Sequence, residues 1–159
     1  MPRSRIKTYV IAILIPLAVG FLSSLLTMES MDIYSELVTP PLSPPGWLFP
    51  IVWTVLYTLM GVSSALVWEN RSINPGAANC GILYYGASLI FNFLWSIFFF
   101  NFRWLLFSFI WLLILLYLIL RTIVCYKKVS PIAAYLQIPY ALWVAFAGYL
   151  NFTLWILNR

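Results

Sequence analysis

The chain has 159 residues, of which 64% are hydrophobic and only 8% are charged, and its mean hydropathy is +0.96. Soluble domains carry roughly 25% charged residues, so this composition excludes a soluble protein and predicts an integral membrane protein. The net charge of +5 comes from scattered basic residues, which excludes a nucleic-acid-binding surface, and the lack of histidine excludes histidine-ligated haem and histidine-based catalysis.

Apolar segments long enough to cross a bilayer recur along the whole chain. Alternating strand patterns are missing, which argues against an outer-membrane barrel. We therefore predict an all-α integral membrane protein, a bundle of five transmembrane helices that forms one domain over residues 1–159. The predicted helices are, in chain order, 8–27, 45–68, 79–100, 104–126 and 131–157.

The basic residues divide unequally between the two sides of such a bundle. The side of the N-terminus carries Arg3, Arg5, Lys7, Arg71, Arg121, Lys127 and Lys128, and the other side carries Arg103 and Arg159. Because basic residues concentrate in cytoplasmic loops, we predict a cytoplasmic N-terminus and a C-terminus outside. The odd number of spans and the lack of an internal repeat disfavour an inverted-repeat transporter.

The longest polar connection runs from Met28 to Pro44 and leads through a proline cluster into the second predicted helix. Loops of this length are often functional lids, although an ordinary connector is at least as common. Just inside the helix, Trp53 and Tyr57 share one face because they are four residues apart. This arrangement predicts a loop that lies directly above an aromatic stripe.

Three tryptophans are not readily explained by an interfacial belt: Trp53 lies below the outer end of the second predicted helix, Trp95 near the outer end of the third, and Trp143 in the middle of the fifth. They come from three different helices and could face one space in the outer half of the bilayer. An aromatic pocket with a few polar groups is the usual small-molecule site. Asn92 is a candidate polar member, but an interhelical hydrogen bond explains a buried amide equally well.

Groups for acid–base chemistry are scarce in the predicted spans. All four acidic residues lie in predicted loops, so proton-coupled transport and acid–base catalysis lack their usual residues. The two cysteines, Cys80 and Cys125, have no metal-ligand spacing, and we interpret each as a buried, inert thiol. Aromatic surface and neutral polar groups therefore remain as the candidate functional features.

Five segments outside the first and fourth predicted helices carry a specific resemblance. They are Tyr34-x5-Pro40, Pro44-Pro45-x-Trp47, Val52-Trp53-x-x-Leu56-Tyr57-x-x-Met60-Gly61, Asn92-x-x-Trp95-x-x-x-Phe99-Phe100 and Gln137-x-Pro139-Tyr140-x-x-Trp143-x-x-Phe146-Ala147-x-x-Leu150-Asn151. In order and spacing this set resembles the translocator protein family, also called the TspO/MBR family, tryptophan-rich sensory proteins or peripheral benzodiazepine receptors, and specifically a bacterial member.

The resemblance implies a five-helix bundle, commonly a homodimer, with a pocket closed by the loop between the first two helices. It implies binding of porphyrins, such as protoporphyrin IX or haem, and of benzodiazepine-type or isoquinoline ligands, with no required cofactor. Carried over by position, the pocket residues are Tyr34, Trp53, Tyr57, Asn92, Trp95, Trp143, Phe146, Ala147 and Leu150. In bacterial members, the tryptophans that match Trp53 and Trp143 are implicated in light-dependent porphyrin breakdown.

Two departures from the family pattern bear on function. The family often has tryptophan at the position of Leu42, and the cholesterol motif of animal members is replaced here by Phe152 and Ile156. Taken as a whole, the resemblance implies a tetrapyrrole-binding membrane protein that acts as a sensor, scavenger or carrier. The alternatives are light-dependent oxidative porphyrin degradation through Trp53 and Trp143, and a lipid or sterol carrier.

Overall fold

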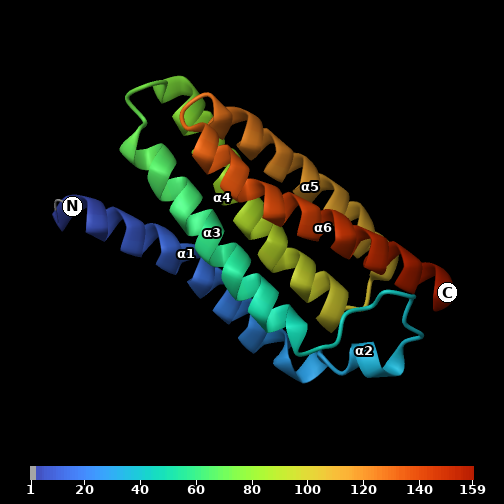
Figure 1. Cartoon of the computed structure of the whole chain (residues 1–159). Helices are drawn as coiled ribbons and strands as arrows, with labels where there is room; N and C mark the ends of the chain where they lie inside the picture. The colour runs from blue at the N-terminus through green and yellow to red at the C-terminus, as the bar shows by residue number, and fades with distance from the viewer. Residues whose placement is uncertain (1–2) are drawn as a thin grey trace.

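The computed structural model describes residues 3–159, and within that range the chain is helical and contains no strand (Figure 1). The long helices are α1 (Arg3–Thr27), α3 (Leu48–Glu69), α4 (Pro75–Ser96), α5 (Leu105–Lys127) and α6 (Pro131–Leu157). The short elements are η1 (Met28–Ser30), α2 (Ile33–Glu36) and η2 (Ile97–Asn101). Within the described range, five helical segments are long and apolar enough to cross a membrane, which confirms the predicted fold class.

The helix boundaries differ most from the predicted ones at two starts: α1 begins at Arg3 rather than at residue 8, and α4 begins at Pro75 rather than at residue 79. Helix α3 begins at Leu48 rather than at residue 45. The Asn74 side chain accepts a hydrogen bond of 3.1 Å from the Ala77 N–H, and Pro75 occupies the first helical position. Asparagine before a helix and proline at its first position are both signals of a helix start. Asn74 is therefore the N-cap of α4, and Pro75 and Gly76 lie in its first turn.

The five long helices run alongside one another, and the two ends of the bundle that they form differ (Figure 1). We name as the loop end the one that carries α2, the start of α3, η2 and the C-terminus. The opposite end, here named the basic end, carries the connections at 70–74 and 128–130. Helix α6 packs against α5 and α3, α4 packs against α5, and α1 packs against α3.

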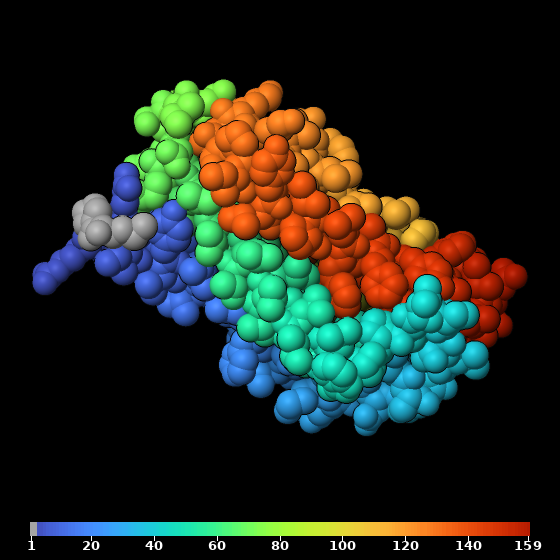
Figure 2. Space-filling view, in the orientation of Figure 1, coloured from blue at the N-terminus to red at the C-terminus, as the bar shows by residue number. Residues whose placement is uncertain are grey.

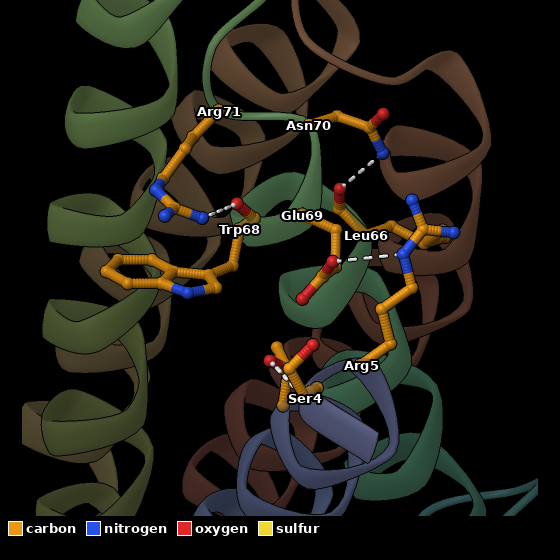
Figure 3. Close-up of polar contacts among 8 residues, drawn as sticks. Ser4, Arg5, Leu66, Trp68, Glu69, Asn70 and Arg71 are labelled. Atoms are coloured by element: carbon orange, nitrogen blue, oxygen red, sulfur yellow. Dashed lines mark hydrogen bonds and ion pairs between the residues drawn. The ribbon is translucent and has the colours of Figure 1, made fainter. Parts of the chain in front are cut away.

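Helix α1 joins the bundle through a close approach to α3. A Cβ added at Gly61 would collide with the backbone of Ile13 and Ala12, so only glycine fits there. At the basic end, Arg5 Nε lies 3.4 Å from Glu69 Oε2, which links the start of α1 to the end of α3 (Figure 3). These contacts place α1 against α3 rather than against α5 or α6.

The end of α3 is capped by its own following residues (Figure 3). The Arg71 guanidinium donates a hydrogen bond of 2.6 Å to the Trp68 carbonyl and lies 4.4 Å from the centre of the Trp68 ring. Asn70 Nδ2 donates to the Leu66 carbonyl at 2.8 Å. The backbone N–H groups of Asn70 and Arg71 donate to the same two carbonyls at 3.2 Å and 3.4 Å, so the side-chain donors reinforce the backbone bonds that end the helix.

Candidate functional site

The loop end encloses a cavity of about 950 Å³ that is lined by α1, residues 31–50, α3, the end of α4, η2 and α6. This volume lies near the upper end of the roughly 300–1,000 Å³ range of small-molecule sites. The residues that line it carry no charged side chain. The space therefore suits a large, mainly apolar ligand with few formal charges to desolvate.

One side of this cavity is aromatic. Trp53, Trp95 and Trp143 all line it, from α3, α4 and α6 respectively. Trp53 stacks on Tyr57 with ring centres 5.4 Å apart, and Phe49 meets Trp143 edge-on at 5.9 Å. The rings support one another and leave indole faces available, which is the arrangement that binds flat aromatic molecules.

Hydroxyl groups supply most of the polar lining, and only the two tyrosines among them were predicted from the sequence as site residues. They are Ser23, Ser24, Thr27, Ser35, Thr39, Ser43, Thr54 and Ser96, with the Tyr34 and Tyr57 phenols. Several already donate to a backbone carbonyl of their own segment; Thr54 Oγ1, for example, donates to the Pro50 carbonyl at 2.7 Å. A hydroxyl that donates in this way keeps its oxygen as an acceptor for a ligand.

The connection between α1 and α3 is docked on the bundle by side chains at its centre. Ile33 is 1% exposed and packs with Phe99 and Leu154. Tyr34 lies on Phe49 and Phe99, with ring centres 5.7 Å and 6.2 Å away, and lines the cavity. Burial raises the pKa of the Tyr34 phenol to about 12.

Polar contacts hold the same connection to the C-terminal part of α6. The Val38 N–H donates to Asn158 Oδ1 at 3.0 Å, and Asn158 Nδ2 donates back to the Val38 carbonyl at 3.1 Å. The Tyr149 hydroxyl donates to the Pro41 carbonyl at 3.1 Å. Figure 2 shows this cyan segment lying against the red end of the chain. Residues 31–44 therefore cover one side of the cavity; whether they open and close stays a prediction.

The structure brings together seven of the nine site residues named from the sequence. Those that line the cavity are Tyr34, Trp53, Tyr57, Trp95, Trp143, Ala147 and Leu150. Asn92 lies behind the lining, where its Nδ2 donates to the Tyr57 hydroxyl at 2.9 Å, the interhelical hydrogen bond that was the alternative for this amide. Phe146 contacts Trp143 and Tyr149 outside the lining, with ring centres 5.6 Å and 6.1 Å away.

Asn151 is a further lining residue, and the Leu150–Asn151 pair of the family motif was its signal. Its Oδ1 accepts a hydrogen bond of 3.2 Å from Trp95 Nε1, and its Nδ2 donates to the Leu105 carbonyl at 2.7 Å. The side chain is 1% exposed and thereby joins α4, α5 and α6 at one point. Asn151 fixes the orientation of the Trp95 indole, which a stacking surface requires.

The sequence matches known proteins over nearly its whole length. The model of the TspO/MBR family covers residues 12–156. The Tryptophan-rich protein TspO of Chlorobaculum tepidum is 36% identical over 97% of this chain and 98% of its own length. The Translocator protein of Bos taurus is 34% identical over 92% of this chain and 87% of its own, and the Protein CrtK of Rhodobacter capsulatus is 34% identical over 79% and 78%. This chain therefore belongs to the TspO/MBR family of multi-pass membrane proteins.

Proposed function

We propose that this protein is a membrane translocator or sensor whose cavity binds a flat tetrapyrrole of the protoporphyrin IX or haem type. Family membership and the names of relatives, Translocator protein among them, support the role in the membrane. The observation that carries the ligand class is the cavity of about 950 Å³ into which three tryptophans from three helices converge. A broad, flat, apolar ring system uses both this volume and these indole faces.

The chemistry of binding follows from the lining. The chain has no histidine, and neither cysteine lines the cavity, so the ring is held by stacking and apolar burial rather than by an axial protein ligand of these types. The carboxylates of such a ligand cannot pair with a charged residue of the lining and instead turn to its more exposed hydroxyls, such as Ser24 and Thr39. There, hydroxyl donors and water share the task of solvating the charge.

A titration of the purified protein with protoporphyrin IX in detergent tests this proposal, with three variants beside the wild type. Trp143→Ala removes a stacking face and buried area, so its affinity falls by roughly 5- to 100-fold. Trp143→Phe keeps a flat apolar face and retains most of the affinity. Trp104→Phe is the matched control, because Trp104 is 52% exposed and lies outside the cavity. Equal affinity in all four proteins would exclude the cavity as the porphyrin site.

Two ring contacts of Trp53 favour a second candidate function, light-dependent oxidative breakdown of the bound porphyrin. Trp53 stacks on Tyr57 and meets Tyr140 edge-on, with ring centres 6.3 Å apart in the second pair, so an oxidisable indole adjoins two phenols. Porphyrin loss under illumination in air is compared with dark affinity in the wild type, Trp53→Phe, Trp143→Phe and the double variant. Loss of breakdown with retained affinity supports the second function; a parallel fall in both leaves the tryptophans as binding surfaces alone.

A further inference from the structure

Two thiols meet at the basic end of the bundle, far from the cavity in the fold. Cys80 lies near the start of α4, Cys125 lies in the last turn of α5, and their sulfur atoms are 3.0 Å apart. The residues are 45 positions apart in sequence, and both are free cysteines. The contact is therefore a product of how α4 and α5 pack and not of local sequence.

A glycine next to Cys80 allows this approach. A Cβ added at Gly81 would lie 2.5 Å from Tyr126 Cδ1 and 3.2 Å from Cys125 Cβ, so only glycine lets the end of α5 come so near. Tyr126 is itself fully buried, and its hydroxyl lies 3.0 Å from Ser64 Oγ on α3. The packing around the two thiols holds both helices in place and keeps the sulfurs facing each other.

We propose that Cys80 and Cys125 are a redox modification site, at which a hydroperoxide converts the two thiols into a reversible disulfide between α4 and α5. Their sulfurs need to approach by only about 1 Å to reach the S–S bond length of about 2.05 Å. The basic end is the one predicted to face the cytoplasm, where thiols are kept reduced. The disulfide there is a transient response to oxidant rather than a permanent crosslink.

The exposure of the two cysteines sets the order of the steps. Cys80 is half-buried whereas Cys125 is 6% exposed, so the hydroperoxide reaches Cys80 first. The Cys80 thiolate attacks the peroxide, an S–O bond forms, the O–O bond breaks, and an alcohol or water leaves with a proton. The Cys125 sulfur then attacks the sulfenic acid, the S–O bond breaks, and water leaves with the proton of the second thiol. Overall, two thiols lose two electrons and two protons, and the hydroperoxide is reduced to alcohol and water.

Hydrogen peroxide is the probe for the test, applied in stoichiometric amount to the full, reduced chain in detergent. Intact mass, free-thiol count and peptide mapping are then measured, before and after dithiothreitol. The wild type loses both thiols and two hydrogen atoms, the peptide of Cys80 is linked to that of Cys125 within one chain, and dithiothreitol restores the starting mass. Thermal unfolding of the oxidised wild type shifts to a higher temperature, because a closed loop restricts the unfolded chain.

Cys80→Ser and Cys125→Ser are the controls, each with one remaining thiol. Neither variant can lose two hydrogen atoms within one chain, and the unfolding temperature of neither rises with peroxide. Cys125→Ser, which keeps the more exposed thiol, reacts faster than Cys80→Ser. Three results would overturn the proposal: oxygen added to the wild type without loss of hydrogen, a disulfide between two chains, or an unreactive wild type in which a small alkylating reagent still modifies Cys80.

Discussion

The two ends of the bundle use the space between the helices in opposite ways. At the basic end, Ser63 Oγ donates to the Ala133 carbonyl at 2.7 Å and accepts from Gln137 Nε2 at 3.1 Å, which joins α3 to α6. Tyr126 and Ser64 join α5 to α3 in the same region. At the loop end, aromatic rings surround a cavity of about 950 Å³ instead.

This contrast shows how a small membrane bundle can keep a large cavity. Helices in a bilayer are held by close packing and polar contacts, since lipid gives no hydrophobic drive between them. The basic end supplies both kinds of contact, with Ser63 and Gln137 no more than 1% exposed. The loop end then needs only local anchors. Asn151 accepts a hydrogen bond from Trp95, and Asn158 accepts one from Val38 in residues 31–44, here named the covering segment. We expect stability to be concentrated at the basic end and binding at the loop end.

Cavity-creating substitutions give the largest test of this division. Ile119, which is fully buried in α5, and Leu150, which lines the cavity, are each replaced by alanine. Ile119→Ala opens a new void in packed surroundings and lowers the free energy of unfolding by about 3 kcal/mol. Leu150→Ala only enlarges an existing space and lowers it by about half as much. Reversible unfolding in mixed detergent measures both, and equal losses would contradict the division.

Adding one methyl group tests the contact between α1 and α3. In Gly61→Ala the new Cβ meets the α1 backbone, which cannot move without displacing the helix, so we expect a loss of about 2 kcal/mol. Gly86→Ala on α4 is the matched control, because a Cβ there meets nothing within 4 Å. Its alanine gains helix propensity and leaves stability unchanged or slightly higher. The same unfolding assay distinguishes them, and a tolerated Gly61→Ala would show that α1 is only loosely attached.

The bundle itself could be predicted because the bilayer as a solvent permits few structures. Apolar segments of spanning length have to form helices, and hydropathy therefore locates all five. The convergence of Trp53, Trp95 and Trp143 followed from their depth along three helices. Family motifs added Tyr34 from the connection, which no periodicity would have identified.

The sequence does not show which neighbouring helix provides the contact partner of each polar or small residue. The Asn92 amide had two interpretations until Tyr57 was seen to accept its hydrogen bond. The contact of Cys80 with Cys125 depends on the glycine beside Cys80, whose role appears only once α4 and α5 are packed. The type of a side chain indicates that it needs a partner. The rotation of each helix about its axis and the arrangement of the helices in the bundle decide which residue is that partner.

The smallest effect concerns the covering segment of the loop end, and it is expressed as a dependence on pH. Burial holds the pKa of Tyr34 at about 12, against 10.0 for an exposed phenol. Between these two values the undocked phenol loses its proton while the docked one keeps it, so the undocked state binds fewer protons. The free energy of undocking therefore falls as pH rises through this window and is constant below it.

Acrylamide quenching of tryptophan fluorescence should increase across pH 10–12 in the wild type, because the cavity indoles become accessible. Tyr34→Phe keeps the ring but cannot ionise, so its quenching should change less over the same range, while the buried tyrosines of the spans are common to both proteins. Identical pH profiles would show that the segment stays docked when Tyr34 ionises and that it covers the cavity without serving as a lid.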